Sequence, residues 1–138
     1  MSVTEEGRKG EVAARLFLKS LGYQIFQGDW IGKSNGGEWH LFEVKRQEPF
    51  VPPPFYGHGL PLWQIKARLN FQRETGVIAV LLIWDTCESC WYHQRLDTLE
   101  IGEYIDTNGQ NPRRVYNVNS FEKHNPVQLS LPLQQVLK

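Results

Sequence analysis

The segment Val77–Asp85, with the sequence VIAVLLIWD, restricts the fold of this chain more than any other feature. It is an almost continuous apolar run rich in branched residues, which is typical of a strand buried on both faces. Such a strand needs cover from other elements on each side, and the run is far too short to cross a bilayer. The sequence therefore predicts a sheet with this strand at its centre.

Helical and strand periods in the rest of the chain predict the elements around this strand. The proline-rich segment Gln47–Leu60 is expected to form a loop. The predicted helices are Thr4–Leu21 and Pro61–Glu74, the second of which starts at a proline and ends before Gly76, and the predicted strands are Tyr23–Ile31, Trp39–Arg46, Trp91–Arg95 and Val115–Val118. This order predicts a mixed α/β fold in which helices flank a central mixed sheet.

The composition fits one compact domain with an ordinary core. The chain has 138 residues, of which 41% are hydrophobic, and this excludes a wholly disordered protein. Fifteen basic residues balance fifteen acidic ones, which excludes a globally basic protein that coats nucleic acid but leaves a local basic patch open. Two cysteines are too few for a disulfide framework, and the charged N-terminus lacks an apolar signal segment, so a cytoplasmic protein is expected. We expect one domain over residues 1–125 and a tail over residues 126–138.

The strongest chemical signal is the Glu-x-Lys sequence formed by Glu43 and Lys45 in the second predicted strand. Side chains alternate across a strand, so these two share one face. Asp29 lies on the preceding strand, and the turn at Ser34–Gly37 decides whether it meets Glu43. A two-residue loop pairs positions that sum to 71 and puts the two acids on opposite faces, whereas a three-residue loop gives a sum of 72 and puts them opposite each other on one face.

Two facing carboxylates are best tolerated with a cation between them, and hard oxygen ligands suit Mg²⁺ or Mn²⁺. Lys45 would then orient or deprotonate an attacking water, or stabilise charge on a phosphate. Glu11 on the first predicted helix and Gln64 at the start of the second fit the same site. These residues therefore form a candidate site for phosphoryl chemistry.

In this order and spacing, the chain resembles the PD-(D/E)XK nuclease superfamily, and within it the archaeal-type Holliday junction resolvases and related phage and bacterial nucleases. The resemblance covers about residues 7–85 and rests on Gly10-Glu11, Asp29, Glu43-Val44-Lys45 and Gln64, with Gly28 standing where the family motif has a proline. It implies a restriction-endonuclease-like core with a divalent-metal site. Asp29 and Glu43 would be metal ligands, Glu11 the helix carboxylate near the metal, Lys45 the catalytic lysine and Gln64 its assistant.

The resemblance implies a Mg²⁺-dependent DNA endonuclease. A structure-specific enzyme similar to Holliday junction resolvases, acting in recombination, repair or the processing of phage or mobile-element DNA, is the finer expectation. The alternative is a non-catalytic DNA-binding module of the same fold that acts with a sliding clamp or a nuclease partner.

DNA binding without net positive charge requires clustered cations. The candidate phosphate contacts are Arg8, Lys9, Lys33, Lys66 and Arg68. Cleavage of both strands needs two sites, so a two-fold homodimer is expected, with Trp63, Phe71 and Trp91 as candidate interface residues.

The C-terminal tail carries an independent signal. Gln128–Leu133, with the sequence QLSLPL, resembles the peptide by which bacterial DNA enzymes dock on the sliding clamp. Leu129, Leu131 and Leu133 would contribute apolar contacts, and Gln128 would hydrogen-bond at the rim of the pocket. Alternatively, these leucines cover an apolar patch on their own domain.

The remaining residues of metal-ligand type form no recognisable site. Cys87 and Cys90 precede His93, but no second cysteine pair exists, so we expect a turn there rather than a zinc site. The four histidines, at positions 40, 58, 93 and 124, form no metal-spaced pair.

Overall fold

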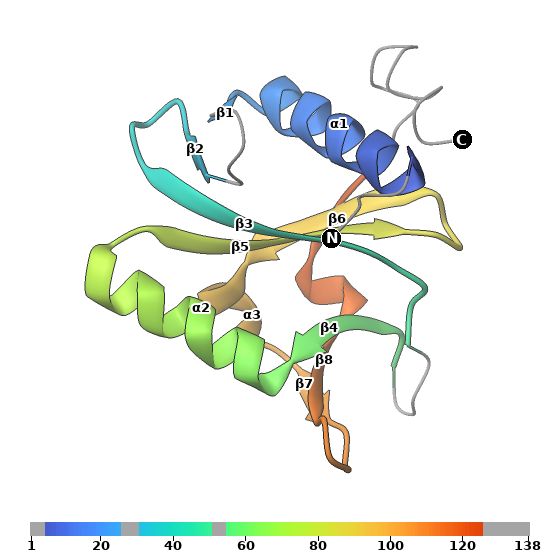
Figure 1. Cartoon of the computed structure of the whole chain (residues 1–138). Coiled ribbons are helices and arrows are strands. Elements are labelled where there is room, and N and C mark those ends of the chain that lie inside the picture. The colour runs from blue at the N-terminus through green and yellow to red at the C-terminus, as the bar shows by residue number, and fades with distance from the viewer. Residues whose placement is uncertain (1–4, 26–30, 51–54, 126–138) are drawn as a thin grey trace.

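The computed structural model describes residues 5–25, 31–50 and 55–125, which form two sheets and their covering helices (Figure 1). The larger sheet has the strand order β1-β2-β3-β5-β6-β9, and the smaller has the order β4-β8-β7. The strands are β1 (Gln24–Ile25), β2 (Ile31–Lys33), β3 (Trp39–Gln47), β4 (Gly57–Pro61), β5 (Ile78–Asp85), β6 (Cys90–Arg95), β7 (Tyr104–Asp106), β8 (Arg113–Asn117) and β9 (Glu122–His124). The helices are α1 (Glu5–Ser20), α2 (Leu62–Thr75) and α3 (Leu96–Glu100), with a 3₁₀ turn η1 at Val118–Ser120.

The apolar run predicted as a central strand is β5, and all eight of its residues are buried. It pairs in parallel with β3 on one side and antiparallel with β6 on the other, so the sheet is mixed. Helix α1 covers one face, whereas α2, α3 and the smaller sheet lie on the other (Figure 1). The predicted fold class, a mixed α/β fold with a central mixed sheet flanked by helices, is therefore confirmed.

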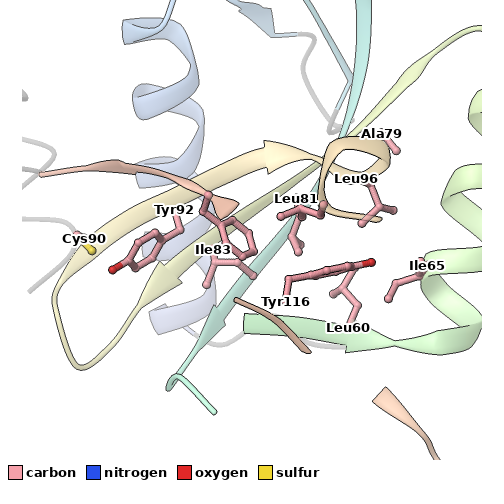
Figure 2. Packing of buried hydrophobic residues seen from close by; sticks show 11 residues of the cluster. Leu60, Ile65, Ala79, Leu81, Ile83, Cys90, Tyr92, Leu96 and Tyr116 are labelled. Carbon is pink, nitrogen blue, oxygen red and sulfur yellow. The ribbon is translucent and has the colours of Figure 1, made fainter. Parts of the chain in front are cut away.

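Alternate side chains of β5 enter two separate cores. On the α1 face, Leu82 packs in a cluster with Phe17 and Phe42. On the other face, Leu81 and its neighbours pack against Tyr116 and the residues of β4 and α2 (Figure 2). Burial on both faces explains why the run shows no polar alternation.

The hairpin between β2 and β3 has the three-residue loop. Ile31 pairs with Leu41, which gives the sum of 72, and Ser34 N–H donates to the Glu38 carbonyl at 2.9 Å. Gly37 closes the loop with φ at 86°, a conformation that glycine adopts without strain. The loop is therefore the three-residue alternative. The predicted single strand Tyr23–Ile31 is wrong, because its start forms β1, which pairs antiparallel with β2, and Asp29 lies outside the described residues.

The prediction of a loop throughout Gln47–Leu60 is wrong at its end, because Gly57–Pro61 forms β4. Its glycines allow close approach to β8 rather than marking a turn. A Cβ at Gly59 would collide with the carbonyl oxygen of Arg114, and one at Gly57 with that of Tyr116. Glycine inside a strand can signal such a close backbone contact as well as a break.

The helices begin and end close to the predicted residues, and Gly76 ends α2 in the left-handed conformation. Elements α3, β7 and β9 were not predicted, because each has only three to five residues and leaves no readable period. None of the described helices is long and apolar enough to span a membrane. The tail from residue 126 onward lies outside the described residues.

Candidate active site

Strand β3 sorts its side chains as predicted from alternation. Phe42 is buried in the α1 core and Val44 packs against the same core, so Glu43 and Lys45 project toward the α2 face. Both are half-buried. The structure therefore places a carboxylate and an ammonium next to each other on a sheltered sheet face.

Helix α2 lies over this face and contributes the cation that pairs with Glu43. The Nε of Arg68 donates to Oε1 of Glu43 at 3.0 Å, and the side chains are 35% and 17% exposed. Arg68 was predicted to contact phosphate. The structure pairs it with the carboxylate of the candidate site, and its contact with phosphate stays a prediction.

The contacts of α2 also show where Gln64 stands. Gln72 accepts from the N–H of Ala79 at the start of β5, and one turn earlier Arg68 reaches Glu43, which pairs with Leu81 further along β5. Helix α2 therefore runs in the opposite direction to β3. Gln64 lies one helical turn before Arg68, and Lys45 is the next residue after Glu43 on the same face of β3, so Gln64 lies on the Lys45 side of the site.

Lys45 has no hydrogen bond or ion pair with any other residue that the structure describes. Its ammonium is therefore free, within that part of the chain, to act on a ligand. Asp29 and the side chain of Glu11 lie outside the described residues, so their place in the site stays a prediction.

The other candidate phosphate contacts fall into two groups. Lys33 and Lys66 are exposed, and the Nζ of Lys33 lies 5.9 Å from the centroid of the Trp39 ring. The side chains of Arg8 and Lys9 lie outside the described residues.

The candidate interface residues also differ from one another. Trp63 is 67% exposed and Phe71 is 38% exposed, both on α2. The proposal for Trp91 is wrong, because it is 1% exposed and stacks on Phe17 in the α1 core.

A buried polar network at the ends of β3 and β5 was missed by the sequence analysis. His58 and Asp85 are 0% and 1% exposed, and His58 Nε2 lies 2.7 Å from Asp85 Oδ2. His58 Nδ1 lies 2.9 Å from Gln47 Oε1, which also accepts from the N–H of Gly59. Asp85 Oδ1 accepts from the N–H groups of Cys87 and Glu88. The network joins β4 to β3, which carries Glu43 and Lys45, and to β5.

The hydrogen bonds of this network determine which of its atoms carry protons. Because Gln47 Oε1 is an acceptor, His58 Nδ1 must donate, so a second proton must lie between His58 Nε2 and Asp85 Oδ2. Burial lowers the pKa of His58, and the hydrogen bond to Asp85 opposes that shift. An aspartate directly after an apolar run was the available sequence signal, since a buried carboxylate needs partners.

The prediction that the histidines form no metal-spaced pair does not hold in three dimensions. His93 and His124 are 31 positions apart, yet His124 Nε2 lies 2.8 Å from His93 Nδ1. The two residues meet because β9, which was not predicted, pairs with β6. Sequence spacing alone does not reveal a pair formed between strands that are distant in the chain.

Comparisons with known proteins place these observations in context. No protein-family model matches the sequence, and no curated protein matches it. Among solved structures, the chain is similar to Hjc, a Holliday junction resolvase from the archaeal hyperthermophile Archaeoglobus fulgidus. Identity is 15%, the match covers 78% of this chain and 84% of that chain, and the TM-score is 0.49. So weak a likeness assigns no activity, and function must be inferred from the residues of this chain.

Proposed function

We propose that this chain is a metal-dependent DNA endonuclease that hydrolyses phosphodiester bonds at Glu43 and Lys45. The observation that supports this most is their position on one half-buried face of β3, with the Lys45 ammonium unpaired among the described residues. Charged groups on a sheltered sheet face are costly unless they are paired or used. Arg68 pairs with Glu43, whereas Lys45 is left for a ligand.

The donor chemistry of the proposed site fits Mg²⁺ or Mn²⁺. Glu43 provides a carboxylate oxygen, and with Asp29 and Glu11 the proposed ligand set consists of oxygen atoms, which hard divalent cations prefer. The register of β2 against β3 supports the inclusion of Asp29, because it is the one in which residues summing to 72 pair. When bound, the ion would neutralise charge that builds on the scissile phosphate.

The residues of the chain itself would then perform three tasks. Lys45 would position the attacking water through its ammonium, and would donate a hydrogen bond to the phosphate as negative charge develops there. Arg68 would hold the carboxylate of Glu43 in one orientation through the 3.0 Å hydrogen bond. Gln64 would donate or accept a hydrogen bond beside Lys45. A bond forms between the water oxygen and phosphorus, and one phosphorus–oxygen ester bond breaks.

The direct test is cleavage of labelled duplex, single-stranded, flap and four-way DNA in Mg²⁺ or in EDTA. We expect cleavage in Mg²⁺ and none in EDTA, with the four-way junction cut fastest if the finer proposal of a resolvase-like enzyme holds. Binding to DNA without cleavage of any substrate would favour the alternative, a non-catalytic DNA-binding module. Failure to bind or cleave any of the four substrates would contradict both.

A two-fold homodimer remains part of the proposal, because cutting two strands requires two copies of this site. The exposed aromatic residues Trp63 and Phe71 on α2 support a contact there, since large exposed apolar side chains often mark interfaces.

Replacing Arg68 with glutamine is expected to lower the Mg²⁺ concentration needed for half-maximal cleavage by roughly fivefold. The guanidinium lies beside Glu43 and repels a bound cation, so its removal makes the site more negative. The measurement is cleavage rate against Mg²⁺ concentration. Arg73→Gln removes the same charge from an exposed position on α2 and is the matched control. An increased Mg²⁺ requirement in Arg68→Gln alone would contradict the expected direction, and would show that orienting the Glu43 carboxylate outweighs the repulsion.

We propose that Gln128–Leu133 binds a bacterial sliding clamp. A synthetic peptide of residues 126–138 is expected to bind the clamp in a titration, and a double change of Gln128 and Leu131 to alanine to remove binding. Pro132 restricts the backbone and so lowers the entropy lost on binding. Absence of binding by the unchanged peptide, together with lower thermal stability of the chain when the tail is deleted, would favour packing of the leucines on their own domain.

A further inference from the structure

Three side chains with metal-binding atoms converge on the α1 face of the sheet, where β6 pairs with the edge strand β9. His93 lies directly opposite Glu122 in the register, and His124 lies two residues further along β9, so that all three side chains share this face. One ligand atom from each residue lies within 4.8 Å of the other two. His93 Nδ1 and His124 Nε2 are 2.8 Å apart, and Glu122 Oε2 is 3.6 Å from His93 Nε2.

The surroundings hold the two rings in place while leaving an approach from solvent. The His124 ring makes an edge contact with Phe17 of α1, with the centroids 5.1 Å apart. The side chain of His93 is 15% exposed, whereas that of Glu122 is 66% exposed. Glu122 faces Nε2 of His93, so it would change rotamer to reach an ion held at Nδ1. The cluster therefore combines two fixed imidazoles with one adjustable carboxylate.

The geometry points to a binding site for a borderline divalent transition metal such as Zn²⁺, with His93, His124 and Glu122 as ligands and water completing the coordination. Imidazole with carboxylate is a donor set that zinc uses, usually in tetrahedral sites with metal–nitrogen distances of about 2.0–2.1 Å. These distances separate two ligating nitrogens by about 3.3 Å. The two nitrogens would need to separate by about half an ångström from their 2.8 Å hydrogen bond, and the rings would need to turn so that both lone pairs meet at the ion.

Metal binding leaves the number of protons on the two imidazoles unchanged. Without metal, one N–H lies between the rings, because a hydrogen bond between two neutral imidazoles needs one donor and one acceptor. With metal, His93 Nδ1 and His124 Nε2 both present lone pairs, and each ring keeps its proton on its other nitrogen. Both imidazoles stay neutral, and no net proton is released.

This site is separate from the proposed nuclease centre. The cluster lies on the α1 face at β6 and β9, whereas Glu43 and Lys45 project toward the α2 face from β3. The donor sets differ as well, because the cluster contains imidazole nitrogens and the nuclease centre is proposed to contain only oxygen ligands. The inference therefore stands whether or not the chain cleaves DNA.

The experiment uses the full chain with Cys87→Ser, which removes the exposed thiol as a competing ligand. The probes are Co²⁺, followed by its visible absorption, and Zn²⁺, followed by competition with Co²⁺ and by the melting temperature. With excess Mg²⁺ present to fill the proposed nuclease centre, we expect one Co²⁺ ion per chain with a tetrahedral-type spectrum. Zn²⁺ should raise the melting temperature, because a ligand that binds only the folded state stabilises it. A hundredfold excess of Mg²⁺ should not displace the Co²⁺.

Three variants locate the ion. His124→Gln and His93→Gln are expected to weaken binding at least tenfold, and Glu122→Gln to weaken it less, while circular dichroism confirms that each is folded. Glu48→Gln removes an exposed carboxylate outside the cluster and should bind as the parent does. The inference is overturned if the parent shows no saturable binding, or if folded His124→Gln binds as tightly as the parent.

Discussion

Replacing Lys45 with alanine is expected to lower Mg²⁺-dependent DNA cleavage by about 10²- to 10⁴-fold, the range that a positioned proton-transfer or hydrogen-bonding group supplies. DNA affinity should change little, because a group that acts mainly in the transition state contributes to the rate more than to binding. The folded state should also be retained, since Lys45 makes no hydrogen bond or ion pair with the other described residues.

The measurements are single-turnover cleavage with enzyme in excess and DNA affinity by fluorescence anisotropy in EDTA. Lys19→Ala is the matched control, because it removes an exposed lysine of α1 that is not among the candidate phosphate contacts. Equal cleavage rates for Lys45→Ala and the unchanged chain would show that the assigned role of Lys45 is wrong. An equal loss in both lysine variants would indicate general charge attraction to DNA instead.

Replacing Asp85 with alanine is expected to lower the free energy of unfolding by about 3–5 kcal/mol, the usual cost of removing one partner of a buried ionic pair. His58 would lose its 2.7 Å partner in a fully buried position, and two backbone N–H groups would lose the acceptor at Oδ1. The measurement is urea unfolding at pH 7.

Asp85→Asn is the matched control for this prediction. The asparagine keeps the Oδ1 acceptor, and its amide can donate to Nε2 of a neutral His58 whose Nδ1 proton still reaches Gln47. Every hydrogen bond of the network is then retained, so we expect a loss of about 1 kcal/mol or less. Equal losses in the two variants would contradict the proton arrangement inferred for the network.

The residues of β3 and β5 show what the sequence could predict. A strand buried on both faces and a hairpin with a glycine turn are local patterns, so Val77–Asp85 and a hairpin turn at Ser34–Gly37 were predicted from neighbouring residues alone. The choice between a two-residue and a three-residue loop was left open. The sharing of one face by Glu43 and Lys45 follows from the same local alternation. These predictions required no knowledge of which strands pair.

The features that were missed depend on pairing between distant segments. Gly57 and Gly59 suggested a turn, and only contact with β8 shows that they permit two backbones to approach. The pairing of Arg68 with Glu43 was missed, because the sequence does not show that α2 lies over Glu43. His93 meets His124 only through the pairing of β6 with β9, whose three residues carry no period.

The parallel pairing of β3 with β5 also has a consequence for how the protein folds. His40 pairs with Ile78, so the register joins residues 38 positions apart, and the connection between them contains both β4 and α2. Closing such a long connection lowers the chain's conformational entropy before the new contacts can compensate. Proteins rich in contacts between distant residues fold slowly for this reason. The hydrogen bond between His58 and Asp85 joins this connection to the end of β5, so it forms only when β5 is in place. A nascent chain that ends before Asp85 would therefore contain His58 without its buried partner.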